Sequence, residues 1–166
     1  GLIPRLRAGA LPGSSRWVDI TFRPGERGGD PFLALAYALK TVLGTTGRRE
    51  VELAEELRLK PDGFAAVVGQ WLSGSSLAAE FLLVVDQFEE LFTLVADDVR
   101  AEFIGLIETI VGMPQVRVVA TIRADFTAGV AEVPALSRLF QGRGIFLLSA
   151  PGVLALTEMI RRPAQA

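Results

Sequence analysis

The stretch FLLVVDQFEELF, residues 81–92, decides the fold of this chain. Its first residues, Phe81 to Val85, are all apolar, as expected of a strand that is buried on both faces of a parallel sheet. Asp86 ends this run, and Glu89 and Glu90 follow within one helical turn. A carboxylate at the end of a buried strand is costly unless it meets water, a cation or a hydrogen-bond donor. The stretch therefore predicts a parallel sheet with an acidic turn at its edge.

Strands and helices alternate on both sides of this stretch. Further strands are predicted at residues 17–22, 116–122 and 144–148, where aromatic, β-branched or apolar residues run together. Helices with one apolar face are predicted in the first ten residues, at 31–43 between an Asp30 cap and Gly44, at 50–59, at 64–72 after a turn at 61–63, at 98–111, after 122 through to 140, and at 153–161. Because no hairpin turn separates neighbouring strands, the fold class is α/β, a parallel sheet with flanking helices.

Composition limits the chemistry that this chain can perform. Its 166 residues are 50% hydrophobic with a net charge of −2, which suits one domain with a sizeable core and shows no nucleic-acid signature. The sequence contains no cysteine and no histidine, which excludes disulfides, thiolate zinc sites, cysteine proteases and hydrolases with a histidine base. Charged residues interrupt every long apolar run, and the start lacks a signal-peptide pattern. We expect a cytoplasmic protein, with no membrane partner, whose chemistry uses carboxylates, arginines, hydroxyls or a hard cation.

The acidic turn has the residues of a Walker B motif. In that motif the strand-end carboxylate, here Asp86, holds Mg²⁺, and a following acid, here Glu89 or Glu90, orients the attacking water. The structural alternative is an aspartate that only caps the end of a strand.

A second polar group ends the next predicted strand. In VVATIRADF, residues 118–126, Thr121 and Arg123 follow the apolar run. If the two strands are neighbours, about 4.8 Å apart, Asp86 and Arg123 face one crevice. A guanidinium there can contact a γ-phosphate and stabilise charge in a transition state. The alternative is that Arg123 only pairs with Asp86 or Asp125.

The phosphate-binding part of such a site is missing from the sequence. No GxxxxGK[ST] segment occurs, so these residues include neither the backbone cradle nor the lysine of a P-loop. The glycine-rich loop at residues 23–29 has neither that spacing nor a lysine, and we interpret it as a connection between strand and helix.

LLVVDQFEELFTL, residues 82–94, followed by VRVVATIRADF, residues 116–126, resembles the core of the novel STAND NTPases. These are bacterial signal-transduction ATPases of the P-loop class, often fused to WD-type repeats. Residues 1–39 resemble the segment after the family's P-loop helix, and residues 147–164 resemble its last core strand and the helix that enters the lid.

The resemblance implies an incomplete domain. Residues 1–150 would be a P-loop NTPase core of the ASCE and STAND type that lacks its first strand and P-loop, and residues 151–166 would begin a lid or helical region. The missing strand would lie between the predicted strands at 116–122 and 144–148. The chain would then be a central piece of a longer protein and inactive alone.

The resemblance also implies roles by position. Asp86 would be the Mg²⁺ carboxylate, Glu89 the leading candidate and Glu90 the second for polarising water, and Arg123 the sensor arginine. Thr121 would bond Mg²⁺-bound water. The complete domain would bind ATP and Mg²⁺ and would associate with itself or with protein partners.

Other classes of function remain open. A non-catalytic interaction module with an NTPase-like shape would use the gap in the sheet to pair with a partner strand. A phosphoacceptor receiver would use Asp86 and Thr121, but it needs a lysine where this chain has residues 149–151, Ser-Ala-Pro. A Mg²⁺ nuclease built on Asp86, Glu89 and Glu90 would lack a nearby lysine and a basic face.

Overall fold

Three parallel strands form the centre of the structure, a computed structural model that describes residues 1–44, 47, 49–60, 62–74, 80–140, 144–149, 151–152, 156–158 and 161. The strands are β1 (Val18–Phe22), β2 (Phe81–Val85) and β3 (Val116–Ala120), in the order β1-β2-β3. Every residue of β2 is buried, as expected of the middle strand of a covered parallel sheet. The predicted fold class, an α/β chain with a parallel sheet flanked by helices, is confirmed.

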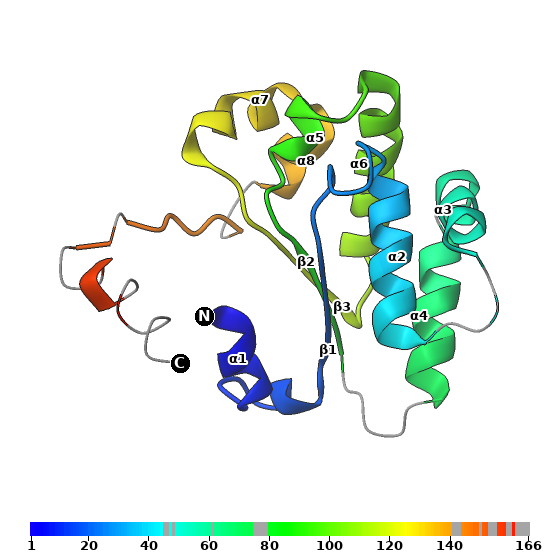
Figure 1. The fold of residues 1–166 in the computed structure, drawn as a ribbon, viewed down its shortest axis with the longest axis horizontal. Coiled ribbons are helices and arrows are strands. Elements are labelled where there is room, and N and C mark those ends of the chain that lie inside the picture. Colours follow the sequence, from blue (N-terminus) through cyan, green and yellow to red (C-terminus); the bar gives the residue numbers. More distant parts are fainter. Residues whose placement is uncertain are drawn as a thin grey trace.

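Four helices cover one face of the sheet (Figure 1). They are α2 (Pro31–Leu43), α3 (Glu50–Leu59), α4 (Asp62–Gly74) and α6 (Asp97–Val111). The core between them and the sheet is rich in phenylalanine. Phe103 of α6 makes edge-to-face contacts with Phe22 and Phe32, at centroid distances of 6.1 and 5.1 Å.

The ends of these helices follow the local chemistry of the sequence. The Asp30 carboxylate accepts hydrogen bonds from the backbone N–H groups of Phe32 and Leu33 and caps α2, and Gly44 ends that helix in a left-handed conformation. Both were predicted. The predicted turn at residues 61–63 is wrong in part, because α4 already begins at Asp62. Its carboxylate lies in the first turn, where the helix dipole favours negative charge.

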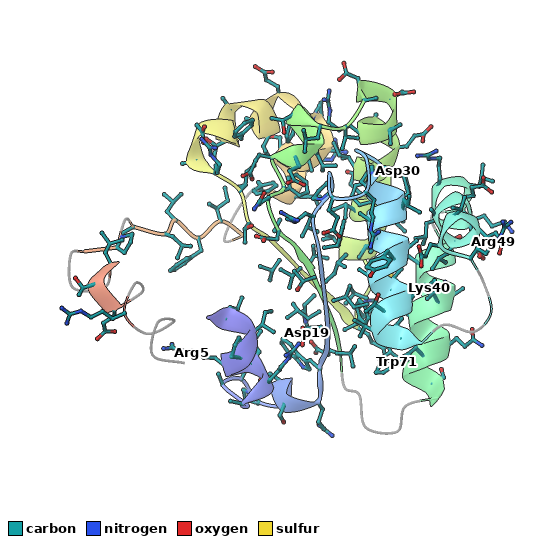
Figure 2. All side chains as sticks on the ribbon, viewed as in Figure 1. Arg5, Asp19, Asp30, Lys40, Arg49 and Trp71 are labelled. Carbon is teal, nitrogen blue, oxygen red and sulfur yellow. The ribbon has the colours of Figure 1, made fainter. Side chains whose placement is uncertain are left out.

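A short helix, α1 (Leu2–Arg7), lies on the opposite face (Figure 1). Leu6 packs against Leu82 and Val84 of β2, in a small apolar cluster separate from the main core. Arg7 donates two hydrogen bonds to Asp19 of β1, at 2.8 and 2.7 Å, where β1 faces α1 (Figure 2). A 3₁₀ turn, η1 (Ser14–Arg16), connects α1 to β1.

The remaining short helices lie at the carboxyl end of the sheet (Figure 1). They are α5 (Glu90–Thr93), the 3₁₀ turn η2 (Ala124–Phe126), α7 (Thr127–Glu132) and α8 (Pro134–Leu139). The helix predicted after residue 122 is thus interrupted, because Pro134 has no N–H and begins a new helix at its first position.

The predicted fourth strand is wrong. Residues 145–149 are extended but pair with no strand of the sheet, and they run away from it (Figure 1). Ile145, Phe146, Leu147 and Leu148 are 53%, 85%, 78% and 86% exposed. An apolar run becomes a strand only where a neighbour accepts and donates its ladder hydrogen bonds, and β3 is the last strand on this side of the sheet among the described residues.

The last predicted helix, at 153–161, is helical at residues 156–158 and 161; residues 153–155 and 159–160 lie outside the described part. Among the described residues, no helix has both the length and the apolar character needed to cross a membrane.

Candidate functional site

The ends of β2 and β3 bring Asp86 and Thr121 together. Strand pairing continues one residue past each strand, because the N–H of Asp86 donates to the carbonyl of Phe22 at 2.9 Å and that of Thr121 donates to the carbonyl of Val85 at 3.0 Å. The Thr121 hydroxyl then donates to Oδ1 of Asp86 at 2.6 Å. The strands β2 and β3 are therefore neighbours, which the sequence analysis had left open.

Thr121 also holds the acid turn, which we define as residues 86–90. Gln87 has a φ of 53°, a left-handed conformation that costs a non-glycine residue about 1–2 kcal/mol. Its N–H donates to the Thr121 hydroxyl at 3.0 Å, and the N–H of Phe88 donates to the Thr121 carbonyl at 2.8 Å. Phe88 is buried, which fixes the turn in the core. These backbone contacts of Gln87 were missed from the sequence, which carries no local signal for a left-handed glutamine.

Glu89 and Arg123 lie at the same edge. The backbone N–H of Arg123 donates to Oε2 of Glu89 at 3.4 Å, so this carboxylate reaches toward the segment that follows β3. The Arg123 guanidinium makes a two-point ion pair with Asp125, at 3.2 and 2.8 Å. From the sequence, Arg123 could pair with Asp86 or with Asp125; in the structure it pairs with Asp125. Both side chains are more than half exposed, and an ion pair in such a position contributes only about 0–1 kcal/mol. Arg123 can therefore leave Asp125 at small cost.

Glu90 points to the other side of β2. Its Oε2 accepts a hydrogen bond at 2.8 Å from the backbone N–H of Gly25, in the β1–α2 loop (residues 23–30). The two adjacent glutamates, both candidates from the sequence with Glu89 ahead of Glu90, have different contacts in the structure: Glu89 contacts the segment after β3, and Glu90 contacts the segment after β1.

The oxygen ligands at this edge are of the kind that a magnesium ion takes. Carboxylate oxygens are ligands that Mg²⁺ prefers, and it usually keeps several waters and needs only one or two protein carboxylates. Asp86, at the end of β2, supplies one such carboxylate. Within the described residues, no group of three or more histidine, cysteine, aspartate or glutamate side chains is arranged to hold a metal ion.

The family described as Novel STAND NTPase 1 matches residues 1–166. No curated protein and no solved structure matches the chain.

Proposed function

Because the chain belongs to the Novel STAND NTPase 1 family over residues 1–166, we propose that the carboxyl edge of its sheet forms the acid and sensor half of an ATP site in a signal-transduction switch. The observation that carries this proposal is the 2.6 Å hydrogen bond from Thr121 to Asp86, which joins two strand ends into one polar unit. In open parallel sheets, ligands bind outside the carboxyl ends of the strands.

Each residue of this edge has a distinct role in the proposal. Asp86 would hold Mg²⁺, directly or through its waters, and Thr121 fixes the orientation of that carboxylate through its hydrogen bond. Glu89 accepts a hydrogen bond from the attacking water and orients it. Arg123 leaves Asp125 and contacts the γ-phosphate. Mg²⁺, when bound, would neutralise charge on the β- and γ-phosphates.

The phosphate cradle belongs to another part of the site. Residues 1–166 contain no GxxxxGK[ST] segment, so the proposal assigns the phosphate-binding loop to polypeptide outside these residues. Hydrolysis then requires both halves, and we expect residues 1–166 alone to be inactive.

The direct test is Glu89→Gln in a polypeptide that joins residues 1–166 to a phosphate-binding loop. The amide keeps the size of the side chain but removes the carboxylate, so we expect ATP affinity to be retained and turnover to fall by about 10²–10³-fold. Glu55→Gln is the matched control, because Glu55 is an exposed glutamate on α3. Turnover by Glu89→Gln equal to that of the control would remove Glu89 from this role.

A second candidate is a non-catalytic interaction module. Two separate apolar features favour it, the exposed run at residues 145–148 and a pocket beside β3. Phe146 and Leu148 are more than four-fifths exposed, and an open, mostly apolar pocket of about 460 Å³ lies between α1 and β3, with Leu2 and Val119 among its lining. A strand edge and an exposed apolar run are features that pair with other chains.

If the partner is a second copy of the same protein, this candidate predicts self-association. Sedimentation velocity of the protein without nucleotide measures it. We expect the protein to self-associate and Phe146→Ser to make it monomeric. Leu59→Ser is the control, because Leu59 is 79% exposed at the end of α3, on the other face of the sheet. A protein that stays monomeric as its concentration rises would count against self-association through this surface.

A further inference from the structure

The two glutamates of the acid turn have different surroundings, and their functions differ accordingly. We infer that Glu90 is a positioning residue: it holds the β1–α2 loop against the acid turn through its hydrogen bond with Gly25, and it does not orient the attacking water. The observation is the 2.8 Å contact between Oε2 of Glu90 and the N–H of Gly25, which joins residues 65 positions apart. The kinetic part of this inference rests on the proposed function, whereas the structural part does not.

The β1–α2 loop is shaped to fit this contact. A Cβ atom at Gly25 would lie 2.5 Å from Cδ1 of Leu94 and 3.0 Å from Oε2 of Glu90. A Cβ atom at Gly29 would lie 2.5 Å from the backbone oxygen of Leu94, and Gly29 has a φ of +80°. At Gly29 the close atom belongs to the backbone and φ is positive, so a residue without a side chain is needed there for the loop to approach Leu94 this closely.

The same contact is connected to the site by short steps. The backbone N–H of Glu90 donates to the carbonyl of Gln87 at 2.9 Å, and the N–H of Leu94 donates to the carbonyl of Glu90 at 2.9 Å. Phe88 and Leu91 are buried on either side. A shift of Glu90 therefore moves the backbone of Gln87, which adjoins Asp86. By anchoring Glu90, Gly25 fixes the direction in which Asp86 and Glu89 present their carboxylates.

The chemistry of the contact separates the two roles. Gly25 needs an acceptor at the position of Oε2, and the amide oxygen of glutamine supplies one. A water-orienting acid needs a full carboxylate. We therefore expect glutamine at position 90 to keep the hydrogen bond with Gly25, and glutamine at position 89 to lose the function of the carboxylate. Glu90→Asp keeps the charge, but its side chain is one methylene group shorter and the acceptor no longer reaches Gly25.

The first experiment measures hydrogen exchange at the Gly25 amide in the protein without nucleotide. Losing one hydrogen bond changes a local opening equilibrium by about tenfold, so we expect exchange to be about tenfold faster in Glu90→Ala and in Glu90→Asp and nearly unchanged in Glu90→Gln. Glu55→Ala is the control, and circular dichroism confirms folding of each variant. Unchanged exchange in both Glu90→Ala and Glu90→Asp would overturn the inference. If Glu90→Ala does not fold, Glu90→Asp carries the test.

The second experiment measures kcat and KM for ATP in the polypeptide that carries the phosphate-binding loop. We expect Glu90→Gln to keep kcat within about threefold of the unchanged protein, and Glu89→Gln to lose about 10²-fold or more. Glu90→Asp should lower kcat by about tenfold although it retains the charge. A loss in Glu90→Gln as large as that in Glu89→Gln, with Gly25 exchange unchanged, would make Glu90 a catalytic acid and overturn the inference. If no form binds ATP, the proposed function fails, and the exchange experiment still decides the role of Glu90.

Discussion

Replacing Gly29 with alanine tests how closely the β1–α2 loop fits α5. A Cβ at Gly29 would lie 2.5 Å from the carbonyl oxygen of Leu94, whereas a Cβ at Gly28 would meet no heavy atom within 4 Å. Both glycines have positive φ, +80° and +66°, so alanine at either carries the cost of a left-handed backbone, about 1–2 kcal/mol. Only Gly29→Ala must also displace neighbouring backbone, which costs about 1–3 kcal/mol more.

We therefore expect Gly28→Ala to lower the free energy of unfolding by about 1 kcal/mol, because alanine also removes some entropy from the unfolded chain. Gly29→Ala should lower it by about 2–4 kcal/mol. Urea unfolding followed by the fluorescence of Trp17 and Trp71 gives both values, provided that the denaturant slopes agree. If the two variants differ by less than about 0.5 kcal/mol, Leu94 does not limit the space at Gly29 and this reasoning is refuted.

Three further predictions concern the core, a helix cap and the pH dependence of stability. Phe103→Ala should lower the free energy of unfolding by about 3–5 kcal/mol, because a fully buried ring leaves a cavity between helix and sheet; a loss under 1 kcal/mol in urea unfolding would contradict this. Asp30→Ala should lose about 1 kcal/mol through its helix cap, and Asp30→Asn, which keeps an acceptor, should lose clearly less in the same assay. The hydrogen bond from Arg117 lowers the pKa of Glu80, so the stability that this pair contributes is complete above the ordinary carboxyl pKa and is lost as pH falls through the lowered one. In Arg117→Gln the pKa of Glu80, followed by NMR titration, should rise toward its ordinary value; an unchanged pKa would show that another group sets it.

The elements with strong local signals were predictable. An uninterrupted apolar run identified β2, and a carboxylate followed by proline identified the start of α2 at Asp30 and Pro31. The strand predicted at 144–148 failed for a physical reason. The local sequence pattern shows that a segment is apolar, but a strand also needs a hydrogen-bonded neighbour. Among the described residues, no strand pairs with this segment.

The candidate site was predictable in part. The sequence identified two strands that end in polar residues but left open whether they are neighbours; the structure pairs β2 with β3, and the Asp86–Thr121 contact follows from that pairing. The resemblance ranked Glu89 ahead of Glu90, but the sequence could not show the contact that distinguishes their surroundings, because it involves Gly25, a residue far away in the sequence. The roles of all these residues in catalysis stay predictions until the variants are measured.

The distances along the chain between these contacts have a consequence for how the protein folds. Asp86 and Thr121 are 35 residues apart, whereas Glu90 and Gly25 are separated by 65. Closing a longer loop costs more chain entropy, and parallel pairing between distant segments slows folding. We expect the β-α-β unit of β2, α6 and β3 to form first, because its segments are closer along the chain. The strand β1 and the β1–α2 loop would dock on it afterwards. The acid turn would then reach its final shape only in the last step, so that incompletely folded molecules would have no working site.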